Sequence, residues 1–210
     1  MSELFISAFV TLFVVIDPPG CAPIYAGLTA DASRRQAVTM AARACAIAAA
    51  ILLIFALFGE RLLAALHIEL DAFRVAGGIM LFLIALEMVF EKRTQRREQR
   101  AEKVRARHAE TPEVDDVSVF PMAMPMLAGP GSIATMMLLM SRAEGTGQTL
   151  TILGALAAVL ALSFFALAAA GPLMRVLGER VEAVVTRLLG VLLAALAAQY
   201  VLDGVRGMLG

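Results

Sequence analysis

The sequence is poor in the residues that build metal centres and enzyme active sites. It has no tryptophan, two histidines and two cysteines among its 210 residues. Cys21 and Cys45 stand in apolar stretches and show neither a disulfide nor a metal-ligand pattern, so we expect small buried residues. His67 and His108 stand in polar connections. With no HExxH motif, no Ser-His-Asp set and no phosphate-binding loop, the chain is expected to be no enzyme and to hold no metal or cofactor.

Charge is also scarce along most of the chain. Hydrophobic residues make up 60% of the sequence, and the mean hydropathy is +0.81. This is too apolar for a soluble domain of such length, so the composition predicts a membrane protein with several spans. The first residues, Met1 to Glu3, lack the basic region of a cleaved signal peptide. We therefore expect the first apolar segment to be a helix of the mature protein.

Six apolar stretches are long enough to cross about 30 Å of hydrocarbon at about 1.5 Å per residue. These stretches are residues 4–28, 37–58, 73–90, 119–140, 150–173 and 184–205. Asp31 or Ser33 is the expected cap of the second helix. We expect residues 59–61 to end the second span, with an amphipathic segment at 61–67, and Gly171-Pro172 to end the fifth.

Two of the six stretches contain residues that interrupt a helix. The first carries an acid, three prolines and a glycine within seven residues, DPPGCAP at positions 17–23, and the fourth carries LAGPGS at positions 127–132. Proline removes a backbone donor and clashes with the preceding turn. Irregular backbone at membrane depth must face protein or a water-filled cavity. We predict a break in each segment, with Asp17 near the membrane midplane as a candidate functional acid.

The two halves of the chain correspond at an offset of about 111 residues. Matching positions are 16–21 with 127–132, Gly78 with Gly190, and Glu87 with Gln199. Three spans per half is an odd number, so the second half must be inverted relative to the first. The sequence therefore predicts an all-α membrane protein of two inverted three-helix repeats, residues 1–90 and 119–210, joined by a charged linker at 91–118.

The linker carries eight lysines and arginines, interspersed with acids such as Glu98 and Glu102. A basic run can bind nucleic acid, but the acids dilute the field and favour a solvated linker with no nucleic-acid partner. Arg34 and Arg35 fall on the same side of the bilayer as the linker. The excess of basic residues identifies that side as cytoplasmic, and with six spans both termini are expected on the outer side.

Residues 16–25, IDPPGCAPIY, contain an Asp-Pro-x-Gly-x-x-Pro motif, and residues 121–133, PMAMPMLAGPGSI, contain a Pro-x-x-x-Pro-x-x-x-Gly-Pro-Gly motif. In these motifs the sequence resembles the MarC family, which includes the SnatA-type neutral amino acid transporters. The resemblance covers essentially the whole chain, and Pro19 is a departure that stiffens the first break. It implies a six-span inner-membrane protein of the LysE-like transporter group, moving glycine, alanine or similar neutral amino acids.

The two breaks suggest a site for a small zwitterion. Asp-Pro is a good helix start, and each new half-helix would point free N–H groups and a positive dipole end toward the centre. Two such ends can hold a carboxylate, while Asp17 receives the ammonium or carries a coupling proton. Ser132 and Thr135 would add hydrogen bonds. The expected binding residues are Asp17, Pro18, Pro19, Gly20, Cys21, Ala128, Gly129, Pro130, Gly131, Ser132 and Thr135, and the expected pathway residues are Pro23, Glu87, Gln199 and Tyr200.

Each of these assignments has a structural alternative. Asp17 can serve only as a helix cap, and Gly129 and Gly131 only for close helix packing. Glu87 fits an interfacial acid near the end of the third span. Gln199 and Tyr200 fit an interhelical hydrogen bond equally well.

The leading hypothesis is a secondary transporter of small neutral amino acids by alternating access. No ATP-binding motif is present, so a proton or sodium gradient, or the gradient of the substrate, would supply the energy. The alternatives are a channel-like facilitator, an exporter of another small solute, and a non-transporting membrane scaffold. Four alanines between 155 and 161 suit either a homo-oligomer interface or internal packing.

Overall fold

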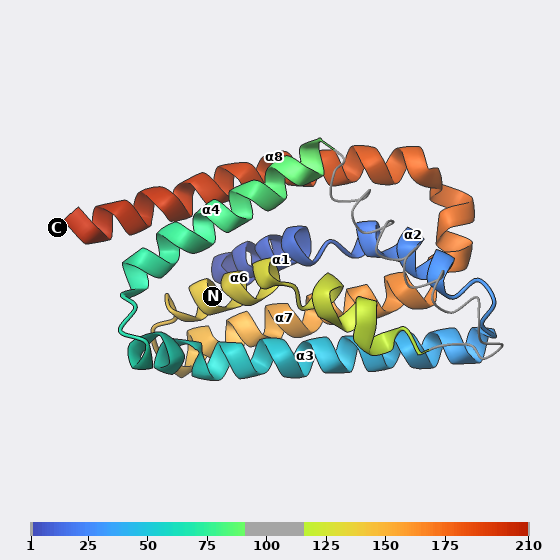
Figure 1. Cartoon of the computed structure of the whole chain (residues 1–210), viewed down its shortest axis with the longest axis horizontal. Helices are drawn as coiled ribbons and strands as arrows, with labels where there is room; N and C mark the ends of the chain where they lie inside the picture. The colour runs from blue at the N-terminus through green and yellow to red at the C-terminus, as the bar shows by residue number, and fades with distance from the viewer. Residues whose placement is uncertain (1, 91–115, 210) are drawn as a thin grey trace.

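The computed structural model describes residues 2–90 and 116–209, apart from the side chains of residues 173–183. Every element in these ranges is a helix, so the predicted all-α class is confirmed for the described residues. In chain order the elements are α1 (Ser2–Ile16), α2 (Pro18–Leu28), α3 (Arg34–Ala65), α4 (Leu70–Val89), the π-helix η1 (Ser118–Leu127), α6 (Pro130–Met140), α7 (Gly145–Ala168) and α8 (Ala170–Leu209) (Figure 1). The predicted linker lies outside the described residues as far as residue 115.

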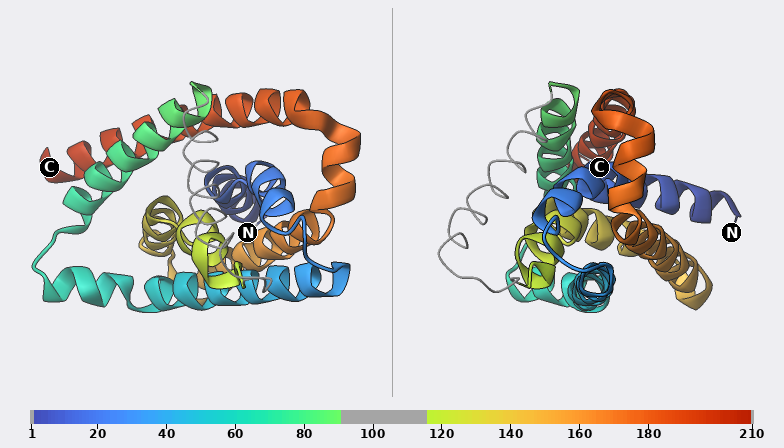
Figure 2. Two further views of the ribbon diagram at one scale, coloured as in Figure 1. Left: turned by 45° about the vertical axis from the view of Figure 1, so that its right-hand side comes forward. Right: turned by 90° about the vertical axis from the view of Figure 1, so that its right-hand side faces the viewer.

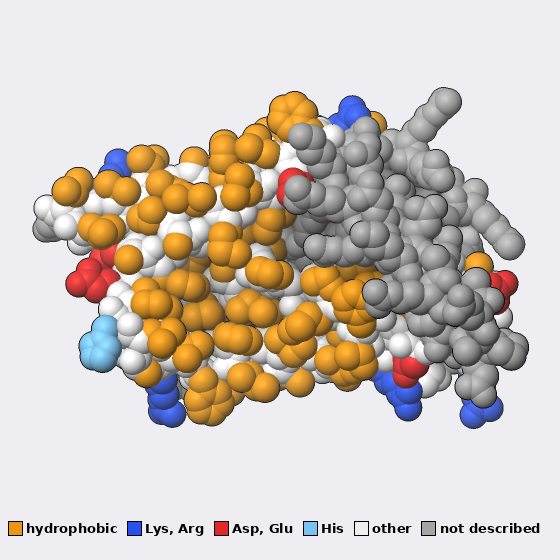
Figure 3. Space-filling view, in the orientation of Figure 1, with side chains coloured by type: hydrophobic (Ala, Val, Ile, Leu, Met, Phe, Trp, Pro, Cys, Tyr) orange, Lys and Arg blue, Asp and Glu red, His pale blue; other side chains and the backbone are white. Residues whose placement is uncertain are grey.

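Six membrane crossings fit the described helices. Residues 2–28, which hold α1 and α2, are long and apolar enough to cross a membrane, as are α3, α4, α7 and Val184–Leu209 of α8. η1 and α6 form a sixth candidate that bends by 52° at its break. In Figure 3 apolar side chains cover the middle of the visible face, and most visible charged side chains lie toward the two ends of the long axis. This distribution fits a long axis that runs across the membrane.

The second span is longer than predicted. α3 begins after Ser33, whose side chain and that of Gln36 cap each other's backbone, so Ser33 rather than Asp31 is the cap. The predicted end at residues 59–61 is wrong, because α3 continues to Ala65. Gly59 sits inside the helix, where a Cβ would lie 2.7 Å from Cγ of Met137. The glycine thus allows close packing. Relative to alanine it costs about 1 kcal/mol in helix propensity, which the long α3 tolerates.

The predicted end of the fifth span is also wrong. α7 ends at Ala168, three residues before Gly171-Pro172, and these two residues lie in the first turn of α8. Proline is tolerated in a first helical turn because the N–H that it lacks has no intrahelical acceptor there. Figure 1 shows that α8 turns a corner after this start and then runs along the whole molecule.

α4 and α8 form a close antiparallel pair. A Cβ on Gly78 would lie 2.9 Å from the Ala197 carbonyl oxygen, and one on Gly204 would lie 2.8 Å from the Asp71 carbonyl oxygen. Gly190 is equally close to the other end of α4. Because these positions carry no side chain, the two backbones approach closely along their length. Figure 2 shows the pair side by side and apart from α3.

The buried apolar side chains form two clusters. The larger cluster draws on α1, α2, α3, η1, α6 and α7 and on Ala170 at the start of α8, and includes Leu12, Leu52 and Ile152. The smaller cluster joins Val15 of α1 and Leu138 of α6 to residues of α4 and α8. The α4–α8 pair thus packs on the remaining helices through a core of its own. The inverted repeat and its boundaries at residues 90 and 119 stay predictions.

The glycine contacts give a test of this pairing. Gly78→Ala places a methyl group 2.9 Å from backbone atoms of α8, which cannot turn aside as a side chain can. We expect a loss of about 1–3 kcal/mol in the free energy of unfolding, seen as a lower melting temperature in detergent. Gly154→Ala is the matched control, because its Cβ would meet only Phe5, at 3.9 Å. Equal melting temperatures for both variants would contradict the close pairing.

Candidate functional site

The first break is the single residue Asp17. Its backbone is left-handed, with φ 59° and ψ 64°, a conformation that aspartate tolerates better than most residues. The Asp17 N–H donates to the Phe13 carbonyl at 2.9 Å and so closes α1. The Asp17 carboxylate accepts from the Gly20 N–H at 3.2 Å and so caps α2. The prediction of a break with Asp17 as helix cap is confirmed.

The N-terminus of α2 uses up its own donors. Pro18 and Pro19 have no N–H. The Gly20 N–H is bound by the Asp17 side chain, and the Cys21 N–H donates to the Asp17 carbonyl at 3.1 Å. The first turn of α2 therefore offers no unpaired N–H to a ligand. Its contribution to a binding site reduces to its dipole and to the Asp17 carboxylate.

The second break is longer and is built differently. η1 contains non-helical backbone at Phe120 and Met124, each followed by a proline, and ends at Leu127. Gly129 is extended and precedes Pro130, the first residue of α6. A Cβ on Gly129 would lie 2.4 Å from the Pro125 carbonyl oxygen, so glycine is required there.

The N-terminus of α6 has backbone N–H groups that find no acceptor within the helix. Gly129 has no side chain to cap the helix, and no side-chain cap is made. The Ile133 N–H donates to the Gly129 carbonyl at 3.0 Å and begins the helical ladder. The amides of Gly131 and Ser132 precede it and have no acceptor within α6. The two breaks are thus unequal, and the amides that a carboxylate can bind belong to α6.

The Thr135 hydroxyl adds a third polar group one turn further along α6. The Thr135 side chain is fully buried, and its hydroxyl has no hydrogen-bond partner in the described part of the chain. An unsatisfied buried hydroxyl costs about 1–3 kcal/mol. Ser132, one turn before it, is buried as well. The first turns of α6 therefore hold more buried polar groups than the surrounding protein satisfies.

The two breaks lie against each other. A Cβ on Gly131 would lie 3.5 Å from Cγ1 of Val15, two residues before Asp17, and 2.4 Å from Cδ1 of Ile84 on α4. The end of α1, the start of α6 and the second half of α4 meet at this point, near the middle of the long axis (Figure 1). The same contacts suit the close packing that the sequence left open for Gly131.

The breaks are closed in this conformation. Asp17, Cys21, Ala128 and Thr135 have exposed fractions of no more than 1%. Among the predicted binding residues only Pro130 is exposed, and among the predicted pathway residues only Gln199. Access of a solute to the buried groups therefore requires helices to move. Pro18, Gly20 and Gly129 are buried, and Pro19 and Pro23 are half-buried.

Gln199 and Tyr200 belong to a separate polar cluster beyond the other end of α6. The Gln199 side chain donates to Asp203 at 2.7 Å, and Asp203 pairs with Arg142 at 2.6 Å. The Arg142 guanidinium lies 4.8 Å from the centroid of the buried Tyr200 ring. Sequence reasoning missed Arg142 and Asp203, although Asp203 follows Gln199 by one helical turn. Glu87 is half-buried on α4.

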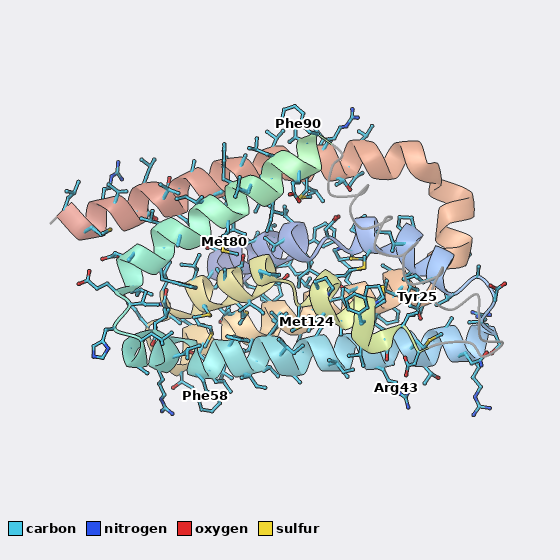
Figure 4. The ribbon with its side chains drawn as sticks, viewed as in Figure 1. Tyr25, Arg43, Phe58, Met80, Phe90 and Met124 are labelled. Atoms are coloured by element: carbon cyan, nitrogen blue, oxygen red, sulfur yellow. The ribbon has the colours of Figure 1, made fainter. Side chains whose placement is uncertain are left out.

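A second ion pair lies at the opposite end of the molecule. Arg43 on α3 pairs with Asp116 at 2.6 Å, just before η1. Hydrogen bonds from Ser118 and from Arg43 hold the pKa of the Asp116 carboxyl below its usual value. The pair lines a cavity of about 290 Å³ together with Arg35 and Gln36. The Tyr25 hydroxyl, at the same end (Figure 4), donates to the Ala37 carbonyl and ties α2 to α3. Among the described residues no group of His, Cys, Asp and Glu is arranged to hold a metal ion.

Asp17 can be tested as a cap before it is tested as a ligand. Asn keeps a side-chain acceptor and tolerates a positive φ, so Asp17→Asn should melt close to the wild type. Asp17→Ala loses the cap and strains the backbone, and should cost about 1–3 kcal/mol of unfolding free energy. Melting temperatures in detergent measure both effects. A large loss in Asp17→Asn would show that the negative charge, rather than the cap, holds the break.

Residues 2–209 match the MarC family of integral membrane proteins. The chain is 36% identical over 208 residues to a UPF0056 membrane protein of Methanocaldococcus jannaschii, covering 99% of this chain and 98% of the relative. It is 36% identical over 211 residues to a UPF0056 membrane protein of Aquifex aeolicus, covering 98% and 94%. It is 32% identical over 208 residues to the UPF0056 inner membrane protein YhgN of Escherichia coli, covering 98% of each. No solved structure matches the chain. The chain belongs to the MarC family of integral membrane proteins.

Proposed function

We propose that this protein is a secondary transporter of small neutral amino acids, such as glycine and alanine, across the cytoplasmic membrane. The observation that carries the proposal is the surplus of buried donors at the start of α6. The Gly131 and Ser132 amides have no acceptor in their helix, and the Thr135 hydroxyl has no partner among the described residues. Buried donors without acceptors are costly. A solute carboxylate would remove that cost whenever it is bound.

The two ends of a zwitterion would be held by the two different breaks. The α6 amides and the Thr135 hydroxyl take the carboxylate, at the positive end of the helix dipole. Asp17 takes the ammonium or carries a coupling proton, and a sodium ion is the alternative coupling ion. The contact between Val15 and Gly131 supports this division, because it brings the residues before Asp17 to the first turn of α6.

Alternating access would come from movement of the α4–α8 pair against the other helices. Support comes from the separate core of that pair and from the burial of the breaks. In this mechanism the Arg142–Asp203 pair closes one end, and the Arg43–Asp116 pair lies at the other. Such partly exposed ion pairs contribute about 0–1 kcal/mol each, so they open at little cost.

The transport proposal is tested by counterflow of labelled alanine and glycine in proteoliposomes. We expect saturable counterflow for the wild type. We expect no counterflow for an Asp17→Asn protein that melts at the wild-type temperature. Counterflow that survives in Asp17→Asn would leave Asp17 as a cap only. Non-saturable flux would favour a channel-like facilitator. Folded protein that neither binds nor moves any solute of a wider panel would favour the scaffold.

Thr135→Val separates a ligand-binding hydroxyl from a structural one. The hydroxyl loses no partner within the described part of the chain, so the melting temperature should stay unchanged or rise. If the hydroxyl binds the solute carboxylate, the apparent affinity should fall by about 1.5–3 kcal/mol, roughly tenfold to a hundredfold.

Ser163→Ala is the matched control, because the Ser163 hydroxyl is equally buried but donates to the Val159 carbonyl at 2.8 Å. Transport by this variant should keep the wild-type affinity. A Thr135→Val protein that melts earlier and transports normally would contradict the assignment.

The orientation is part of the proposal. We place residues 91–118 in the cytoplasm and both termini outside, in agreement with the basic residues and with the inner membrane in the name of YhgN. A membrane-impermeant maleimide applied to intact spheroplasts should label Leu209→Cys and not Arg35→Cys, since both positions are exposed. The native Cys21 and Cys45 are buried and should give little background. The reverse labelling pattern would invert the topology.

A further inference from the structure

α4 crosses α6 with side chains of each helix fitting into glycine gaps of the other. A Cβ on Gly77 of α4 would lie 2.9 Å from Cδ1 of Leu138 of α6. In the opposite sense, a Cβ on Gly131 of α6 would lie 2.4 Å from Cδ1 of Ile84 of α4. Ile84 therefore fills the space that the missing Gly131 side chain leaves.

This contact falls on the turn of α6 whose first amides have no acceptor in their own helix. Gly131 supplies one of these amides, and the other belongs to the next residue, Ser132. Ile84 is half-buried and packs against the cluster that joins α4 and α8 to α1 and α6. Its Cδ1 methyl is thus the part of α4 that reaches the first turn of α6.

We propose that Ile84 limits the size of the solute side chain. This inference rests on the proposed function. The α-carbon of the solute is one bond beyond the carboxylate carbon that the Gly131 and Ser132 amides would hold. In the proposed pose it lies beside the Ile84 methyl, which is the group nearest to the Cβ position of Gly131. Hydrogen or methyl on that carbon, as in glycine or alanine, fits with a small shift of Ile84. A branched or longer side chain meets Cδ1 directly.

Two substitutions at Ile84 enlarge the space beside Gly131 in two steps. Ile84→Val removes only the Cδ1 methyl, and Ile84→Ala removes the rest of the side chain beyond Cβ. We would measure counterflow of labelled alanine, valine and leucine in proteoliposomes for the wild type and both variants. One methylene in an apolar pocket changes discrimination by about tenfold or more. We therefore expect the valine-to-alanine ratio of kcat/KM to rise about tenfold in Ile84→Val and further in Ile84→Ala, with leucine gaining chiefly in Ile84→Ala.

Ile79 provides the matched control on the same helix. It is the same residue type on α4, but its side chain is 51% exposed on the outer surface. Ile79→Val and Ile79→Ala remove the same atoms and should leave the valine-to-alanine ratio at the wild-type value. An equal rise in the Ile79 variants would attribute the effect to a loosened α4 and would overturn the role of Ile84.

The failure of this inference and the failure of the proposed function give different results. Alanine counterflow with an unchanged valine-to-alanine ratio in both Ile84 variants would overturn the inference and leave the transporter intact. Absence of counterflow and binding for every solute, in folded wild-type protein, would overturn both.

A measurement without solute tests the contact itself and remains available if Ile84→Ala fails to fold. In a double-mutant cycle of melting temperatures, Gly131→Ala should be tolerated better in Ile84→Val than in the wild type, because the clashing methyl is gone. Additive effects would show that Ile84 does not fill the gap at Gly131 and would overturn the inference.

Discussion

The fold depends on how a helix can be interrupted inside a membrane, where an unpaired backbone group has no water to bind. Two stretches of this chain meet that constraint in different ways. At the first break two prolines remove donors, and Asp17 binds the next two amides with its side chain and its carbonyl. At the second break glycine replaces the capping side chain, and the amides of Gly131 and Ser132 are left without an acceptor in their helix. The inequality of the two breaks gives them different proposed roles.

Both breaks could be predicted from the sequence because their cause is local. Proline and glycine act on the backbone of their own turn, and Asp17-Pro18 combines a favoured helix cap with a favoured first helical residue. The wrong predictions at Gly59 and Gly171-Pro172 concern positions where the local sequence does not decide between a helix end and a helix interior or start. A glycine inside a helix and a proline in its first turn look the same in sequence as a helix end. The packing on Met137 shows why glycine stands inside α3 at Gly59, and the start of α8 at Ala170 shows that Pro172 opens a helix. The prediction of free N–H groups at both half-helices was wrong for α2. There Pro19 has no N–H, and Asp17 binds the N–H of Gly20.

The contacts between distant segments could not be predicted. Arg142 and Asp203 are 61 residues apart, and the sequence around each of them does not indicate that they pair. The gap at Gly131 could be read as a site or as packing, and the sequence held no sign that Ile84 enters it. A search for acids one helical turn from polar residues in spans would have found Asp203 beside Gln199, though not its ion pair. Long apolar stretches and the local proline and glycine motifs thus predicted the helices and the breaks, while the contacts that close the site come from the tertiary structure.

Ile84 and Asp203 lie on the two helices of one tightly packed pair, and both face partners at the two ends of α6. The glycine contacts between α4 and α8 make it costly to move one helix without the other, because backbone atoms lie within about 3 Å of the missing Cβ atoms. The opposing contacts with α6 are an isoleucine methyl and a partly exposed ion pair, which are individually weak. In the proposed mechanism, one movement of the pair would therefore withdraw the Ile84 methyl from the amides of α6 and separate Asp203 from Arg142. Opening of the site and opening of that end of the protein are then the same step, which a transporter needs if the solute is to leave only toward the side that is open.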